Sequence, residues 1–136
     1  MLKNYIKIYF KKSLNEKIKL FFGQEYFKNR IVLWLLSLGI FLNVIIWLLL
    51  KFLLRSGGSS IILHYNVYFG VDSIGASHEV YVLPFIGCII FFLNLFLSFY
   101  FYIKKERVAS YVLLLTMLMV QGGLLISAIS VIIINY

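Results

Sequence analysis

The sequence predicts an all-α integral membrane protein with three transmembrane helices, preceded by a basic amphipathic helix that lies in the membrane interface. Three observations predict this fold class. The 136-residue chain is 62% hydrophobic, whereas soluble globular chains are about 45–50% apolar. Its mean hydropathy is +0.97, and a soluble domain of this size has too little interior to hide that much apolar surface. Three uncharged apolar runs are each long enough to cross a bilayer, which takes about 20 residues.

The first predicted element is the interfacial amphipathic helix over residues 2–28. Apolar residues recur there at helical spacing beside a row of lysines four residues apart. A helix of this kind rests its apolar face on the acyl boundary and places its lysines among anionic headgroups. Gly23 is a candidate break in it. The lysines expected to contact lipid headgroups are Lys3, Lys7, Lys11 and Lys12.

The rest of residues 1–136 is predicted to complete a single membrane domain. The expected spans are residues 31–54, 82–103 and 108–134, and a polar loop over 56–81 joins the first span to the second. Pro84 falls in the first turn of the second span, where its missing N–H has no helical partner to lose. The second and third spans form a helical hairpin through a tight charged turn.

The distribution of Lys and Arg predicts the orientation. Eight basic residues precede the first span and three lie in the turn at 104–107, whereas the opposite side carries only Lys51 and Arg55. Because the basic side stays in the cytoplasm, the N-terminus is expected inside and the 56–81 loop and C-terminus outside. The Ile-, Lys- and Asn-rich composition hints at a bacterium, hence its inner (plasma) membrane. The net charge of +8 is assigned to the membrane surface, and no nucleic-acid partner is expected.

Three amide side chains, Asn43, Asn94 and Gln121, lie near the centres of the three spans. An amide facing lipid leaves donors and acceptors unpaired, which is costly. We therefore expect these amides to point at one another or at a partner chain. A packing clamp is the favoured interpretation. Contact with another membrane subunit and a polar step in a substrate path are the alternatives.

Small residues also mark faces of the second and third spans, where helix backbones can approach closely. Gly87, Asn94 and Ser98 share one face of the second span. On the third span Gln121 lies roughly opposite the small face. The third span therefore has either two internal interfaces or one internal face and one face for a partner or a second copy. The small face of the third span consists of Thr116, Gly123, Ser127 and Ser130.

The loop over 56–81 is rich in aromatic and β-branched residues, yet it lies outside the spans. Its alternation is poor, so a regular strand is only one possibility. Asp72 and Gly75 are typical of a turn, and we expect His64 and Asp72 to hydrogen-bond within the loop. The residues expected to form an outer recognition surface are His64, Tyr65, Asn66, Gly70, Asp72 and Gly75.

The sequence gives little support to catalysis or to metal binding. His64, Asp72, His78 and Glu79 are the only concentrated set of metal-ligand types, and their spacing matches no standard zinc site. The sequence carries no nucleophile elbow, no HExxH and no phosphate-binding glycine loop. We therefore expect no metal, no cofactor and no enzymatic activity. The rival hypothesis is a membrane enzyme with His64 as base and Asp72 as orienting group.

The spacing of His64, Asp72, Gly75 and Leu83-Pro84 resembles a domain of unknown function. That domain stands at the N-terminus of membrane proteins that give immunity against the sporulation-delaying toxin. The resemblance covers residues 61–87 and includes the position between the first and second spans. Ile62 stands where that family usually has Pro. The resemblance implies a bacterial membrane protein with an outward loop, and by extension toxin immunity.

The leading functional hypothesis is a non-enzymatic small membrane protein that acts through protein or lipid contacts, as an accessory subunit or an immunity or sensor component. Its expected partners are a bilayer with anionic headgroups and either a membrane-protein partner or further copies of itself. The alternative hypothesis is a self-associating channel or transport protein in which Asn43, Asn94 and Gln121 line a polar path.

Overall fold

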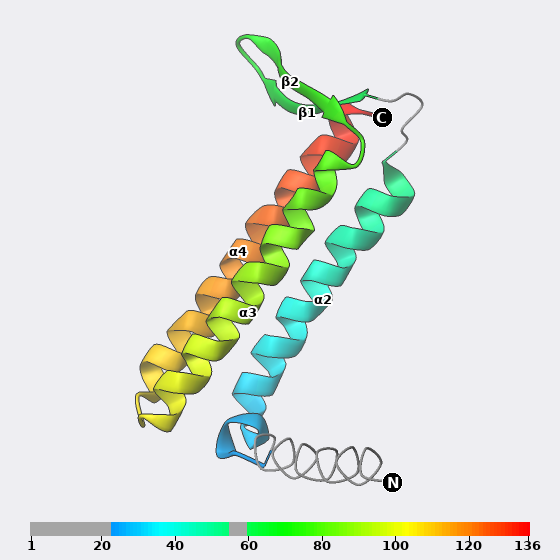
Figure 1. Cartoon of the computed structure of the whole chain (residues 1–136). Helices are drawn as coiled ribbons and strands as arrows, with labels where there is room; N and C mark the ends of the chain where they lie inside the picture. The colour runs from blue at the N-terminus through cyan, green and yellow to red at the C-terminus, as the bar shows by residue number, and fades with distance from the viewer. Residues whose placement is uncertain (1–22, 55–59) are drawn as a thin grey trace, which may run out of the picture. The chain divides into compact units, whose positions relative to one another are not determined.

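The computed structural model describes residues 23–54 and 60–136, and the chain divides into two compact units, Met1–Trp34 and Leu35–Tyr136. Figure 1 shows the elements along the chain. In order they are η1 (Glu25–Lys28), α2 (Arg30–Leu53), β1 (Ser60–Asn66), β2 (Gly70–Ala76), η2 (Glu79–Tyr81), α3 (Val82–Ile103) and α4 (Arg107–Ile134).

The first unit contains the short 3-10 helix η1 and the start of α2. The Asn29 side-chain oxygen accepts the backbone N–H of Ile31 at 2.9 Å and that of Val32 at 3.4 Å, so Asn29 caps the helix in the usual way. Of the predicted interfacial helix over 2–28, residues 2–22 lie outside the described residues, Lys3, Lys7, Lys11 and Lys12 among them. From Gly23 the chain turns and enters η1, so the last part of that range is not α-helix.

All three predicted spans are confirmed as helices, with ends within one residue of the expected bounds. α2 has 24 residues, α3 has 22 and α4 has 28. At the usual rise these helices are about 33 to 42 Å long, which exceeds the hydrocarbon core of a bilayer, about 30 Å. By length and apolar composition all three can cross a membrane. In Figure 1 α3 runs antiparallel to α4 and to the part of α2 in the second unit.

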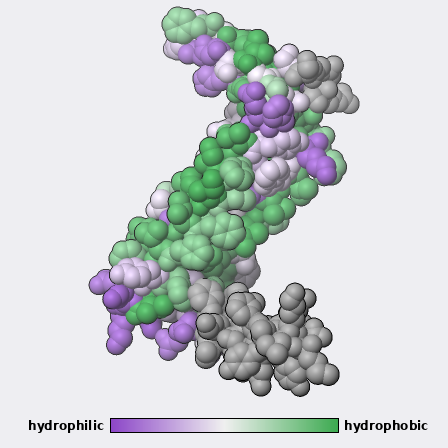
Figure 2. Space-filling view, in the orientation of Figure 1, coloured by the Kyte–Doolittle hydropathy of each residue, from purple (hydrophilic) through white to green (hydrophobic). Residues whose placement is uncertain are grey.

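The surface of the second unit is apolar where the helices face outwards. Figure 2 shows hydrophobic residues over the helices and hydrophilic residues gathered near the α3–α4 turn and at the hairpin. Exposed positions include Phe41, Phe92 and Ile126, whose exposed fractions are 60%, 54% and 68%. Thr116, outside on α4, donates its hydroxyl to the backbone oxygen of Val112. This internal bond leaves the hydroxyl with no need for water.

The buried positions of the second unit recur alternately three and four residues apart. This 3.5-residue repeat is the spacing that lets helices pack along a left-handed seam. On α2 the repeat includes Leu36, Gly39, Asn43, Ile46 and Leu50. On α3 it includes Pro84, Gly87, Phe91, Ser98 and Tyr102, and on α4 Ser110, Leu114, Met117, Gln121 and Ala128.

The expectation of an all-α fold is wrong in the segment between α2 and α3. Residues 55–59 lie outside the described residues, but β1 and β2 form an antiparallel hairpin, followed by η2. The register is irregular around His64, which interrupts the alternation that would have marked β1 in the sequence. Asp72 and Gly75 lie within β2, so the turn predicted there is wrong. The chain reverses instead between Asn66 and Gly70.

A hydrophobic cluster joins the root of the hairpin to the ends of α2 and α4. Ile61 of β1 and Val80 of η2 are 4% and 2% exposed, and both belong to this cluster. The Trp47 and Tyr81 rings stack with centroids 5.4 Å apart. The hairpin is therefore packed on the bundle at its root. The buried members of the cluster are Ile46, Leu50, Ile61, Val80, Ala128, Val131 and Ile132.

Candidate functional site

The hairpin is the candidate site, and one side chain fixes it to α4. The Oδ1 atom of Asn135 accepts the backbone N–H of Ile62 at 2.9 Å, and its Nδ2 donates to the backbone oxygen of the same residue at 2.7 Å. The Asn135 amide thus supplies both hydrogen bonds that a neighbouring strand would supply. A further bond from Nδ2 to the Val131 oxygen, at 2.8 Å, orients the amide on its own helix.

The root of β2 is held from the other side by η2. The Glu79 carboxylate accepts the backbone N–H of Ala76 at 3.3 Å. A Cβ atom at Gly75 would meet Glu79 and the Leu63 side chain. Gly75 therefore lies in close contact with its neighbours within β2, and not in a turn. Gly75 is half-buried at the root of the hairpin, and its predicted part in a recognition surface stays a prediction.

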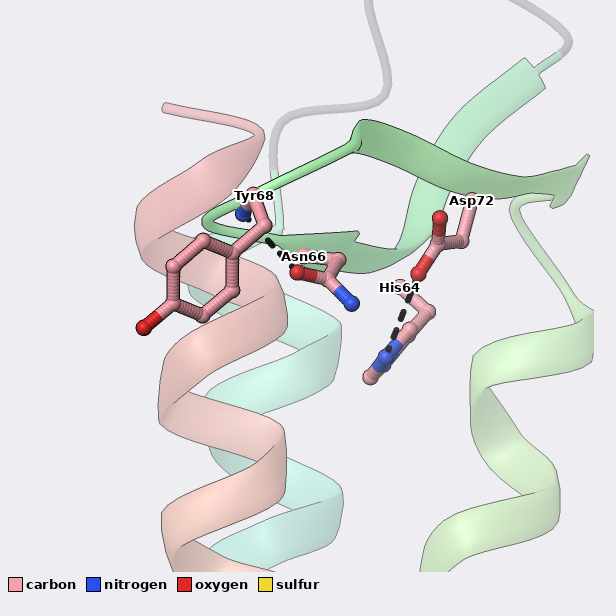
Figure 3. Close-up of polar contacts among 4 residues, drawn as sticks. All are labelled: His64, Asn66, Tyr68 and Asp72. Atoms are coloured by element: carbon pink, nitrogen blue, oxygen red, sulfur yellow. Dashed lines mark hydrogen bonds and ion pairs between the residues drawn. The ribbon is translucent and has the colours of Figure 1, made fainter.

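His64 and Asp72 face each other across the two strands, as Figure 3 shows. His64 Nε2 lies 3.7 Å from Asp72 Oδ2, with the side chains 70% and 38% exposed. This is an ion-pair distance rather than the hydrogen bond that the sequence predicted. Exposed pairs contribute little to stability. Because both side chains are exposed, both can contact other molecules. Neither His78 nor Glu79 joins them, and within the described residues no three His, Cys, Asp or Glu converge on a possible metal site.

The tip of the hairpin consists of Val67, Tyr68 and Phe69. Their exposed fractions are 85%, 91% and 85%. The Asn66 side-chain oxygen accepts the Tyr68 N–H at 2.9 Å (Figure 3), and Gly70 closes the turn with φ of +82°. Asn66 and Gly70 are predicted from the sequence as recognition residues and not as a turn, and the three residues between them are not among the predicted site residues. The pair Asn66 and Gly70 around three residues is itself a hairpin-turn signal.

A second polar site lies at mid-length in the bundle. Asn43 Nδ2 donates to Gln121 Oε1 at 3.2 Å and to the Pro84 backbone oxygen at 3.0 Å. Gln121 Nε2 donates to the Gly87 oxygen at 2.8 Å. Each carbonyl oxygen has a second lone pair and accepts these bonds beside its helical one. Asn43 and Gln121 are 6% and 0% exposed, so this amide cluster joins α2, α3 and α4 out of reach of solvent.

Two residues of the amide cluster were not assigned to it by the sequence analysis. Cys88 donates its thiol to Asn43 Oδ1 at 3.1 Å. The sequence predicts Gly87 on a small face, and in the structure Gly87 also lies directly against the amides of Asn43 and Gln121. A Cβ there would lie 2.6 Å from Asn43 Nδ2 and 3.0 Å from Gln121 Oε1. Glycine is thus the residue that leaves room for both amides.

Asn94 does not join the other two amides, which corrects the expectation that all three meet. Its Nδ2 donates to the Ile90 oxygen one turn earlier in α3, at 2.9 Å. Nearer the α3–α4 turn the helices are joined by Ser98 and Ser110. Their hydroxyls are 2.7 Å apart, and the Ser98 hydroxyl also lies 3.1 Å from the Ser110 backbone oxygen. Gly87 and Ser98 are buried, so that small face of α3 packs internally.

The small face of α4 is exposed in the second unit. Ser127 and Ser130 donate to backbone oxygens one turn earlier, at 3.1 and 3.0 Å. No described atom lies within 4 Å of a Cβ built at Gly123. Among the described residues of the second unit this face packs against no other element, which favours the alternative of one internal face and one face for a partner or a second copy.

Comparison of the chain with protein-family models, curated proteins and solved structures returns no significant match.

Proposed function

We propose that the chain is a non-enzymatic protein of the bacterial inner membrane that recognises a protein partner with its β-hairpin. Three helices long and apolar enough to span a bilayer support the membrane setting. The excess of Lys and Arg before α2 and in the α3–α4 turn supports a cytoplasmic N-terminus, with the hairpin outside. Lys3, Lys7, Lys11 and Lys12 would then hold the cytoplasmic side to anionic lipid.

The observation that carries the proposal is the attachment of the hairpin to the bundle. Asn135 holds the backbone of Ile62 with two hydrogen bonds, and Ile61 is buried beneath it. A recognition loop that is ordered before it meets its partner loses less conformational freedom on binding. The exposed residues on the two strands below the tip would make the contacts. This surface, called the stem, consists of His64, Tyr65 and Asp72. The resemblance to immunity proteins names one kind of partner, a secreted toxin.

The self-associating channel gains no support from the amide cluster. Asn43 and Gln121 are buried, and both bond within one chain. A pore-lining amide needs a face toward the water of the path. The printed bond of Asn94 is to its own helix, so Asn94 does not extend the polar cluster formed by Asn43 and Gln121.

Photocrosslinking in native membranes tests the proposal. A photoreactive amino acid replaces Tyr65, which is 46% exposed on the stem, and a matched variant carries it at Ile126, 68% exposed in mid-α4. We expect one discrete protein adduct from position 65, identified by mass spectrometry, and lipid adducts from position 126. The adduct from position 65 should disappear with Asp72→Ala. Lipid adducts alone at position 65 would refute recognition by the stem.

A further inference from the structure

The hairpin tip is uncharged and apolar although it lies outside the candidate spans. Val67, Tyr68 and Phe69 are each at least 85% exposed. From Tyr65 to Val71 the chain has no ionisable Asp, Glu, Lys, Arg or His, and the nearest such side chains are His64 and Asp72. Three consecutive exposed apolar residues at a protruding tip mark a contact surface rather than a water-facing turn.

The attachment of the hairpin fixes where this tip lies along the helices. Asn135 follows the last residue of α4 and bonds Ile62 of β1 directly. The hairpin root is therefore at the level where α4 ends. In a protein that crosses a bilayer, a helix about 42 Å long ends among the headgroups, just outside the hydrocarbon core of about 30 Å.

The length of the strands carries the tip beyond the helices. Six residues separate Ile62 from Tyr68, which is about 20 Å of extended chain, whereas a helix with its side chains is about 10–12 Å wide. Figure 1 shows the hairpin crossing the end of α4 with its tip projecting to the side of the bundle. In Figure 3 the Tyr68 ring points to the side of the hairpin on which the helices run. Beside the bundle, that side holds lipid.

We propose that Val67, Tyr68 and Phe69 are seated in the bilayer interface and anchor the hairpin tip to the lipid next to the bundle. The inference rests on the membrane setting of the proposed function and not on a protein partner. Aromatic rings favour this region because an apolar body and a polar edge suit its two sides. Because the tip lacks Lys and Arg, its binding comes from apolar burial and needs no anionic lipid.

Tryptophan fluorescence of the purified full-length protein in phosphatidylcholine vesicles tests whether the tip lies in the bilayer interface. The reporter is Phe69→Trp in a background with Trp34→Phe and Trp47→Phe. We expect blue-shifted emission and strong quenching by lipids brominated on their acyl chains. A matched reporter, Ser73→Trp at an exposed position beside Asp72 of the stem, should keep the emission of a water-exposed indole and little quenching. Equal, water-like emission from both reporters would overturn the proposal.

Two further measurements, one with a second substitution and one with an anionic lipid, separate contact with lipid from other causes of a blue shift. Adding Tyr68→Asp should abolish quenching at position 69, while slow hydrogen exchange at the Ile62 amide shows that the hairpin stays docked. Adding phosphatidylglycerol should leave quenching unchanged, and a strong increase would overturn the uncharged anchor. A tip that is water-exposed in vesicles but buried in native membranes would overturn lipid seating in favour of a protein contact. These results do not depend on the crosslinking at Tyr65, so either proposal can fail alone.

Discussion

Two carboxamides tie α4 to distant parts of the chain, and their surroundings differ. Gln121 meets Asn43 at a separation of 78 residues, and Asn135 meets Ile62 at a separation of 73. Gln121 is fully buried, whereas Asn135 is half-buried at the end of the bundle. An amide that loses its partner in a dry interior stays unpaired, but at the end of a helix water can replace the partner. The two contacts therefore differ in what their loss costs.

The largest effect should come from Gln121→Ala. The change removes two hydrogen bonds and leaves a cavity at a site with no exposure. We expect the free energy of unfolding to fall by about 2 to 4 kcal/mol, measured by titrating sodium dodecyl sulfate into the protein in mild detergent. Asn94→Ala is the matched control, because Asn94 bonds only its own helix, and should cost under about 1 kcal/mol. Equal losses of unfolding free energy in the two variants would show that the interhelical bonds of Gln121 contribute no more than the bond of Asn94 within its own helix.

Gly87→Ala should have the next largest effect, about 1 to 3 kcal/mol in the same titration. The new methyl group would press on Asn43 Nδ2 and Gln121 Oε1, which are held by their bonds. Gly39→Ala meets the mobile end of Met117 at 2.5 Å and should cost less, because that side chain can move. Gly123→Ala, with no described atom within 4 Å, should be neutral or slightly stabilising. A destabilised Gly123→Ala would contradict this order.

Asn135→Leu should release the hairpin without unfolding the bundle. The variant loses both bonds to Ile62, and the exposed backbone groups turn to water. We expect a local loss of about 1 kcal/mol, seen as about fivefold faster hydrogen exchange at the Ile62 amide. Asn66→Ala removes a bond at the tip only and should leave Ile62 unchanged. Faster exchange throughout α4 in Asn135→Leu would show that the two regions are not separable.

The smallest effect should come from His64→Ala. The pair of His64 and Asp72 is 3.7 Å apart and largely exposed, so its removal should change the unfolding free energy by less than about 0.5 kcal/mol. The hairpin should keep its circular dichroism and its exchange pattern. A large loss of stability would mean that the exposed pair holds the hairpin together, and that contacts at the end of the bundle are not weaker than the buried contact of Gln121.

The spans were predictable because each contains an uncharged apolar run of about 20 residues or more, and their ends agree within one residue. The hairpin was not, since the irregular register around His64 disrupts the two-residue alternation on which strand prediction depends. Asn135 follows α4 with no periodic signal of its own. Its partner, Ile62, contributes only backbone groups, which no side-chain pattern marks.

The amides show a second limit of sequence reasoning. Equal depth of three amides in three helices suggested one cluster, but rotation about the helix axis decides which way each points. Asn94 can satisfy its donor on the Ile90 carbonyl of its own helix, so depth alone does not require a partner. The 3.5-residue repeat through Gly39, Asn43 and Ile46 would have set Asn43 inside. Gln121 follows Met117 and Leu114 in the same repeat.

The place of Gln121 on α4 has a consequence for biosynthesis. During synthesis α2 is made before α3 and α4, and Asn43 is then without either of its interhelical acceptors. Pro84 arrives with α3, and Gln121 arrives only with α4, 78 residues after Asn43. The Asn43 amide therefore gains its two partners on α3, the Pro84 oxygen and the Cys88 thiol, before it gains Gln121 on α4. A chain that ends before α4 would keep the bond from Asn43 to Pro84 and lack the one to Gln121.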